Sequence, residues 1–282
     1  MDIQNPNPAF GSDLGPIHGI PTFMRLPASR TLDGVDVAIV GIPFDSGTSH
    51  RSGARFGPRK IRELSLILWG YNQALAVFPT ADLKIVDYGD VAVVPVDIKA
   101  TMEHITREVQ TILQQDVTVV ALGGDHSVSL PLLRAHAARH GSLAVVHFDS
   151  HPDTWDWEYQ GQPCSHGTPF RRAIEEELVD TNAYVQVGIR GPTSGRNDLS
   201  EAREMGATVL TIDQTLEIGI PAVIGKIRTT IGDRPVYVSL DIDAADPAFA
   251  PGTGTPEVGG LSSYQMLQLV RGLRGLNLVG FD

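Results

Sequence analysis

The chain has 282 residues, with 22 Lys or Arg against 33 Asp or Glu, which gives a formal net charge of −11. This acidic balance argues against a nucleic-acid-binding protein, which needs a basic face. The 42% apolar share, with 20% charged residues, excludes a disordered chain. No apolar run approaches the roughly 18–20 residues that cross a bilayer, and we expect neither a membrane partner nor a signal peptide. A single cysteine, Cys164, suits the reducing cytoplasm.

The first 34 residues are rich in proline and glycine and show no periodic pattern. We expect residues 1–34 to form an irregular N-terminal arm, followed by a single α/β domain over residues 35–282. The arm carries a short apolar cluster that we expect to be exposed and to pack on a neighbouring subunit, formed by Ile17, Ile20, Phe23, Met24 and Leu26.

From residue 35 onwards, short apolar runs alternate with helical patterns. The apolar runs predict buried strands at 35–44, 82–91, 117–122, 143–148, 184–189, 208–212, 236–240 and 276–282. Helices are predicted from Pro58 to Leu64, over 98–113, through Leu130, Leu133 and Ala137, and after a capping box of Ser262 and Gln265. This alternation predicts a three-layer α/β/α sandwich with a mostly parallel central sheet. Residues 69–81 carry mixed signals and are assigned to no element.

Polar side chains follow three of the predicted strands directly. Residues 123–126 read GGDH, residues 149–153 read DSHPD, and residues 241–243 read DID. Ligands of open parallel sheets bind beyond the carboxyl ends of the strands, so we expect these three strands to be neighbours and their side chains to meet at one edge. Carboxylates packed together repel one another, and a bound cation removes that conflict.

The spacing within these motifs also favours a metal site. On an extended segment, side chains two residues apart point the same way, as expected for Asp149, His151 and Asp153, and again for Asp241 and Asp243. With His126, the set has six ligands, enough for two metals that share some of them. Mixed oxygen and nitrogen ligands suit Mn²⁺, Ni²⁺, Co²⁺ or Fe²⁺, and the lack of thiolates argues against structural zinc.

Each motif taken alone has a simpler interpretation. GGDH is compatible with a helix start, and D-x-D after a strand is compatible with a turn. Only the three motifs together, all at strand ends, favour the metal site. Nucleophilic catalysis has less support, because no G-x-S-x-G is present and Cys164 lies in a polar loop with only His166 nearby.

Three segments closely resemble the signature blocks of the ureohydrolase (arginase) family: GGDHS at 123–127, HFDSHPDTW at 147–155 and SLDIDAADPAFAPGTGTPEVGG at 239–260. IPTFMRLP at 20–27 and GTSHRSGARFGPRKIR at 47–62 resemble its agmatinase, guanidinobutyrase and proclavaminate amidinohydrolase branch. The resemblance implies an arginase-like fold and two Mn²⁺ per subunit, with Ni²⁺ or Co²⁺ as alternatives. It also implies hydrolysis of a guanidino group to urea and an amine, in a homo-oligomer of three or six subunits.

The resemblance further implies the role of each residue. One metal would take His126, Asp149, Asp153 and Asp241, and the other would take Asp149, His151, Asp241 and Asp243, so that Asp149 and Asp241 bridge. A hydroxide held between the metals would attack the guanidinium carbon. Asp153 would hold this hydroxide and pass its proton to the departing amine. His166, in SHGTPF, resembles the proton-shuttling histidine of the family, and without the resemblance it would be taken for a loop histidine.

Two departures from the family pattern stand out. Ser150 and Pro152 replace residues common in relatives, and we expect their side chains to alternate away from the ligands. Relatives also continue beyond the last predicted strand into a segment with a glutamate that grips the guanidinium, whereas this sequence ends at Asp282. We therefore expect the natural protein to be longer.

The sequence leaves the substrate open. The first candidate is agmatine, which would give urea and putrescine, and the rivals are 4-guanidinobutyrate, another ω-guanidino acid, and free or alkylated guanidine. A cationic tail would need a carboxylate such as Asp156 or Glu158, and an acidic tail would need a cation such as Arg190 or Arg196. The complete set of six metal ligands argues against a non-catalytic ureohydrolase-like subunit. Because this set suits two metals, it also argues against a zinc deacetylase.

Overall fold

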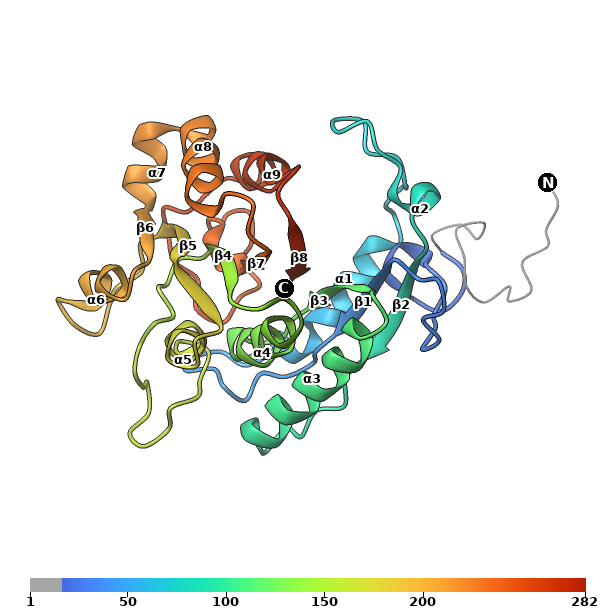
Figure 1. The fold of residues 1–282 in the computed structure, drawn as a ribbon, viewed down its shortest axis with the longest axis horizontal. Coiled ribbons are helices and arrows are strands. Elements are labelled where there is room, and N and C mark those ends of the chain that lie inside the picture. The colour runs from blue at the N-terminus through green and yellow to red at the C-terminus, as the bar shows by residue number, and fades with distance from the viewer. Residues whose placement is uncertain (1–16) are drawn as a thin grey trace.

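The computed structural model describes residues 17–282, and its core is one eight-stranded sheet (Figure 1). Residues 1–16 of the predicted arm lie outside the described residues. The strand order is β2-β1-β3-β8-β7-β4-β5-β6, and every pairing is parallel. The strands are β1 Val37–Gly41, β2 Ile85–Asp90, β3 Thr118–Leu122, β4 Leu143–Phe148, β5 Val179–Ile189, β6 Thr208–Thr211, β7 Val236–Leu240 and β8 Leu278–Phe281.

Helices cover both faces of the sheet, which confirms the predicted three-layer sandwich (Figure 1). The helices are α1 Gly57–Ser65, α2 Pro79–Asp82, α3 Ile98–Leu113, α4 Ser129–His140, α5 Pro169–Glu175, α6 Asp198–Glu204, α7 Ile212–Ile218, α8 Ile220–Ile231 and α9 Ser263–Gly272. Apolar side chains of α3, α4 and α5 pack in one core cluster, and those of α8 and α9 pack in another. Among residues 17–282, no helix combines the length and apolar character needed to span a bilayer.

Local sequence explains why these elements form where they do. All six residues of β4 are buried, as its continuous apolar run predicts for a strand covered on both faces. The predicted capping box at α9 is confirmed, because Ser262 accepts from the backbone of Gln265 and the Gln265 side chain accepts from the backbone of Ser262. The predicted strand at 35–44 is shorter in the structure, since Pro43 has no N–H to continue the ladder beyond β1.

Two other boundaries differ from the prediction. β5 begins at Val179 rather than at residue 184. Leu143 of β4 pairs with Val179 and Val145 pairs with Tyr184, so the shift in register between these two pairs lets β5 include the earlier residues. Within residues 69–81, the structure has an isolated bridge between Asn72 and Val77 and the start of the short helix α2.

The apolar cluster of the arm is only partly exposed, so the prediction that all five of its residues are exposed is wrong. Ile17 and Ile20 are 88% and 58% exposed, whereas Leu26 is buried against the sheet. Hydrogen bonds hold this stretch on its own subunit, since the backbone N–H of Phe23 donates to Asp87 at 2.7 Å and that of Met24 donates to the Ser65 hydroxyl at 2.7 Å.

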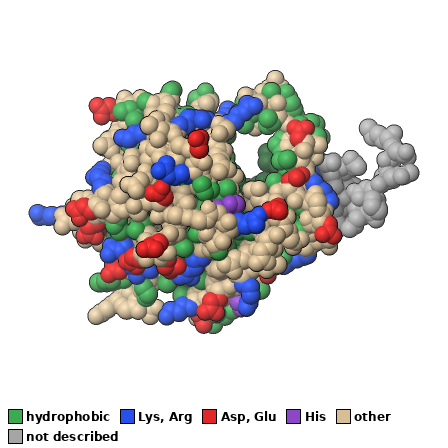
Figure 2. All heavy atoms as spheres, in the orientation of Figure 1, with side chains coloured by type: hydrophobic (Ala, Val, Ile, Leu, Met, Phe, Trp, Pro, Cys, Tyr) green, Lys and Arg blue, Asp and Glu red, His purple; other side chains and the backbone are tan. Residues whose placement is uncertain are grey.

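The strand order decides which strand ends meet at the site. β7 and β4 are neighbours, but β8 lies between β3 and β7. The expectation that these three strands are neighbours is therefore wrong for β3, because β8 inserts between β3 and β7. Elsewhere, acidic and basic side chains are interspersed over the face drawn in Figure 2, so the negative charge forms no single acidic patch on that face.

Candidate metal centre

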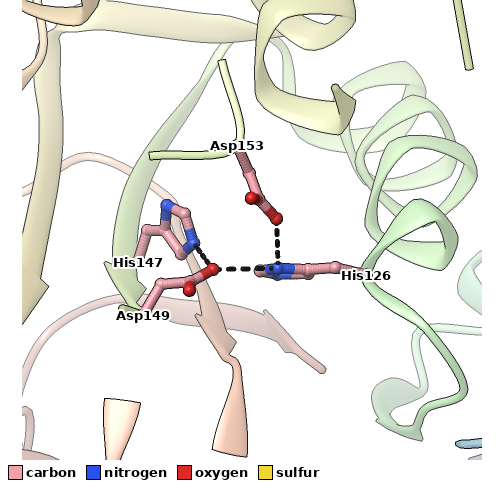
Figure 3. Close-up of side chains that lie close together, drawn as sticks. All are labelled: His126, His147, Asp149 and Asp153. Atoms are coloured by element: carbon pink, nitrogen blue, oxygen red, sulfur yellow. Dashed lines mark hydrogen bonds and ion pairs between the residues drawn. The ribbon is translucent and has the colours of Figure 1, made fainter. Parts of the chain in front are cut away.

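The predicted ligands gather around the imidazole of His126, which is buried in the structure. Its Nδ1 lies 2.8 Å from Asp153 Oδ2, 3.0 Å from Asp149 Oδ2 and 3.4 Å from Asp241 Oδ2. Figure 3 shows the carboxylates of Asp149 and Asp153 directed at this ring from two sides. Three carboxylates, two from the segment after β4 and one from the segment after β7, thus surround one nitrogen atom.

A second group lies next to the first and shares Asp149 with it. His151 Nδ1 lies 3.1 Å from Asp243 Oδ2 and 3.5 Å from Asp149 Oδ1. The two oxygens of Asp149 therefore face different histidines, Oδ2 toward His126 and Oδ1 toward His151. This is the geometry that a carboxylate needs to bridge two cations.

The local backbone brings these side chains together by tight turns and not by an extended segment, so the predicted period-two alternation is wrong. After β4 the chain leaves the strand geometry, and Asp149 Oδ1 accepts from the backbone of His151 at 2.7 Å. Asp153 has a φ of 47°, in the left-handed region. A 3₁₀ turn, Ile242–Ala244, follows β7, and Asp241 caps it by accepting from the backbone of Asp243 at 2.8 Å.

The turn also changes the position of Ser150, which we expected to point away from the ligands. Its hydroxyl donates to Asp243 Oδ1 at 2.7 Å, and its backbone N–H donates to the same oxygen at 3.0 Å. The expectation for Ser150 is therefore wrong. Because the segment is not a strand, adjacent side chains are free to point into the same site.

His147 is part of the cluster, although it was not among the predicted ligands. It is fully buried, its Nε2 lies 2.7 Å from Asp149 Oδ2, and its Nδ1 lies 3.1 Å from the hydroxyl of Tyr184. Its ring stacks on Phe170, with centroids 4.1 Å apart. The available signal was the alternation of residues 147, 149, 151 and 153 as His, Asp, His and Asp.

The charges in this cluster conflict when no cation is present. Burial and the neighbouring carboxylates of Asp243 and Asp149 raise the pKa of Asp241 well above its usual range. Burial and Asp149 raise the pKa of Asp243 in the same way. Burial alone would raise the pKa of Asp149 too, but the neighbouring imidazoles of His126 and His147 outweigh burial and hold that pKa well below its usual range.

The cluster fits divalent cations on the geometry of this chain. Within residues 17–282, the buried Nδ1 of His126 has no hydrogen-bond partner, although three carboxylates face it. Two sets of side chains are close enough to hold an ion: His126, His147, Asp149 and Asp153, and Asp149, His151 and Asp243. Donors of this kind, imidazole nitrogen with carboxylate oxygen and no thiolate, suit Mn²⁺ and its neighbours.

His166 lies on the loop before α5 and pairs with Glu158. Its Nε2 lies 3.4 Å from Glu158 Oε1, and the hydroxyl of Ser49 lies 2.7 Å from the same nitrogen. Burial lowers the pKa of His166, but the hydrogen bond and charge of Glu158 outweigh it and raise the pKa to about 9. The Glu158 carboxylate therefore favours the protonated form of His166.

The structure places the four tail-binding candidates in different surroundings. Asp156 forms an ion pair with Arg172 at 2.7 Å, and Glu158 also accepts from the backbone of Gly167 at 3.0 Å. Arg196 is exposed on the loop before α6. The guanidinium group of Arg190 donates to backbone carbonyls of the loops around the site, those of Gly188, Asp243, Ala244, Ala245, Glu257 and Val258.

Comparison with known proteins identifies relatives along the whole chain. It is 43% identical to guanidinopropionase of Pseudomonas aeruginosa over 100% of this chain and 88% of that protein. It is 45% identical to proclavaminate amidinohydrolase of Streptomyces clavuligerus over 93% and 84% of the two chains.

The fold matches solved structures equally well. The structure of the S. clavuligerus amidinohydrolase superposes with a TM-score of 0.91 at 44% identity, covering 95% of this chain and 89% of that one. A hypothetical agmatinase from Burkholderia thailandensis gives 0.89 at 41% identity, with 99% and 87% covered. The model of the arginase family matches residues 35–282, and the chain is therefore a member of the arginase family.

Proposed function

We propose that this protein hydrolyses the guanidino group of a small linear substrate to urea and an amine, using two divalent metal ions. The observation that carries this proposal is the convergence of Asp149, Asp153 and Asp241 on the unpartnered Nδ1 of His126, beside the second group of His151 and Asp243. Membership of the arginase family, whose enzymes depend on a binuclear metal centre, supports it.

Six residues would hold the two ions. His126, Asp149, Asp153 and Asp241 would bind one, and Asp149, His151, Asp241 and Asp243 would bind the other. When bound, the pair supplies the Lewis acidity that makes water a nucleophile near neutral pH. The two oxygens of Asp149 face different histidines, which supports a bridging role for this residue. Bound cations would relieve the repulsion among the carboxylates of Asp149, Asp241 and Asp243.

Asp153 and His166 are the residues proposed to move protons. Asp153 would accept a proton from the attacking water and pass it to the leaving amine. His166 would exchange protons between this site and solvent, a role supported by its pKa of about 9, which keeps it protonated at neutral pH. Glu158 is then a partner of His166 rather than a ligand of the substrate tail.

The tail of the substrate distinguishes two candidates. Agmatine is the first, and one relative of this chain is named an agmatinase, from Chromobacterium violaceum at 44% identity. An ω-guanidino acid such as 4-guanidinobutyrate is the second, and a specific observation favours it. Both carboxylates proposed to bind a cationic tail are already paired, Asp156 with Arg172 and Glu158 with His166.

We also propose that the preferred metal is Mn²⁺, with Ni²⁺ or Co²⁺ as alternatives, and that the protein is a cytoplasmic homo-oligomer of three or six subunits. Exposed Ile17 and Ile20 support contact of the arm with a second subunit. Light scattering tests the assembly, and a mass equal to one chain would contradict it.

A urea-release assay on metal-stripped protein tests the function. The protein would be reloaded separately with Mn²⁺, Ni²⁺ and Co²⁺ and offered agmatine, 3-guanidinopropionate, 4-guanidinobutyrate and free guanidine. We expect urea from at least one linear guanidino compound and only after metal is restored. Two bound metals without urea from any compound would favour the non-catalytic subunit instead.

A further inference from the structure

Asp282 lies at the end of β8, between the strand that precedes His126 and the strand that carries Ser239. Backbone hydrogen bonds fix its position, since its N–H donates to Val238 at 3.0 Å and its carbonyl accepts from Leu240 at 3.0 Å. The central strand thus brings a carboxylate behind the metal cluster, on the side of His126 away from the ligands.

The Asp282 carboxylate accepts two hydroxyl protons. Ser239 Oγ donates to Oδ1 at 2.6 Å, and the Tyr237 hydroxyl donates to Oδ2 at 2.7 Å. Burial and the charge of Asp282 raise the pKa of Tyr237 well above its usual range, so this hydroxyl keeps its proton. The carboxylate oxygens are the acceptors of both hydrogen bonds, so the proton of Ser239 points toward Asp282.

This direction determines what Ser239 offers to His126. Ser239 Oγ lies 2.8 Å from His126 Nε2. Because the single hydroxyl proton of Ser239 is already directed at Asp282, the Ser239 oxygen accepts a hydrogen bond from Nε2. Ser129 Oγ also approaches Ser239, at the longer distance of 3.5 Å. The hydrogen bond to the charged acceptor at 2.6 Å is the stronger of the two, since charged partners strengthen hydrogen bonds.

The proton on Nε2 leaves the other ring nitrogen of neutral His126 with its lone pair. The carboxylates on that side act in the opposite sense: Asp149 and Asp153, at 3.0 and 2.8 Å, would attract a proton to Nδ1 and so block it as a ligand. The Ser239 hydroxyl, oriented by Asp282, accepts a hydrogen bond from Nε2 and so favours the tautomer that carries its proton on Nε2 and not on Nδ1.

We propose that Asp282, acting through Ser239, is a positioning residue that keeps His126 in the tautomer whose Nδ1 can bind a metal. The inference rests on the metal centre of the proposed function. Groups behind a metal-bound histidine fix its tautomer and orientation, and their loss typically weakens metal binding about 10–100-fold.

Metal affinity measured by competition with a chelator tests this on the metal-stripped full chain, with Mn²⁺ as the probe. Asp282→Asn keeps the shape but can donate to Ser239, which frees Ser239 to donate to His126. We expect one of the two sites to weaken about 10–100-fold. Ser239→Ala should weaken the same site, and the double variant should add little, because both act through one hydrogen bond to His126.

Tyr237→Phe is the matched control. It removes the other donor to Asp282 but leaves the Ser239 hydrogen bond, so both metal affinities should stay within about twofold of the unmodified chain. Unchanged affinity in Asp282→Asn would overturn the inference, and so would an equal loss in Tyr237→Phe, which would indicate packing around β8. Should Asp282→Asn fail to fold, Ser239→Ala decides alone.

The same titration separates this inference from the proposed function. An unmodified chain that binds no metal would overturn the metal centre and the inference with it. An unmodified chain that binds two metals, together with variants that bind them equally well, would overturn the role of Asp282 and Ser239 alone.

Discussion

The carboxylate of Glu158 faces the imidazole of His166, with 3.4 Å between Oε1 and Nε2. Glu158 is fixed in turn by the backbone of Gly167 and the hydroxyl of Ser165. A residue that the sequence offers for binding the substrate tail therefore controls the protonation of a proposed proton carrier. This pair leads to the first two predictions.

Glu158→Gln should move the alkaline limb of the rate profile to lower pH. The pKa of His166 is about 9 because Glu158, with smaller contributions from Asp153 and Asp125, outweighs the effect of burial. Without the Glu158 charge, this pKa should fall toward ~6.5 or below. The shift is measured as kcat against pH in variant and parent, both loaded with the same metal. An alkaline limb that stays in place would mean that His166 carries no proton in the rate-limiting step.

The same pair should make stability depend on pH. The folded pKa of His166 lies above its unfolded value, so the ion pair contributes fully below pH ~6.5 and is lost as the pH rises through about 9. The difference in unfolding free energy between the parent and Glu158→Gln should therefore shrink across this window. Denaturant unfolding of metal-free protein at several pH values measures it, and a difference that grows with pH would contradict the assignment.

Asp149→Asn should lower the amount of bound metal more than the loss of any terminal ligand does, because one oxygen of Asp149 faces His126 and the other faces His151. We expect elemental analysis to give close to no metal for Asp149→Asn and about one ion for Asp243→Asn. Asp156→Asn, at an exposed ion pair with Arg172, is the control and should keep both ions. Two ions and full activity in Asp149→Asn would contradict the bridging role.

Arg190→Lys should impair the enzyme equally for all substrates. The Arg190 guanidinium holds the carbonyls of Asp243 and neighbouring loop residues, and a lysine cannot reproduce its planar set of donors. We expect about a 10–100-fold loss of metal affinity at the Asp243 site and the same relative loss of kcat/KM for agmatine and for 4-guanidinobutyrate. A loss confined to the guanidino acid would instead place Arg190 on the substrate tail. Arg196→Ala provides the comparison, since Arg196 is exposed.

Arg62→Ala should destabilise the fold without removing metal. Arg62 forms two hydrogen bonds to the buried Asp87, at 2.8 and 3.0 Å, and one to Asp90 at 2.6 Å. Removing one partner of a buried ion pair leaves an uncompensated charge and costs about 3–5 kcal/mol. Lys60→Ala, which breaks an exposed pair with Glu63, should cost under about 1 kcal/mol. Urea unfolding compares them, and equal losses would show that burial of Arg62 adds nothing.

The sequence was sufficient for the fold class and for the elements with strong periodicity. Continuous apolar runs such as β4 are buried on both faces, and a helix such as α3 has an apolar stripe at regular spacing, so local patterns carried both predictions. The candidate ligands could also be selected from the sequence, since polar residues directly after parallel strands must meet at one edge of the sheet.

Tertiary structure decided how those ligands meet. Tight turns after β4 and β7 replaced the expected alternation, and the turn after β4 brought Ser150 into contact with Asp243. The insertion of β8 between β3 and β7 placed Asp282 behind His126. Pairing of Glu158 with His166 and the capture of Arg190 by carbonyls depended on contacts between segments far apart in the chain. Local sequence patterns specify local geometry, whereas such contacts are set only when distant strands and loops pack together.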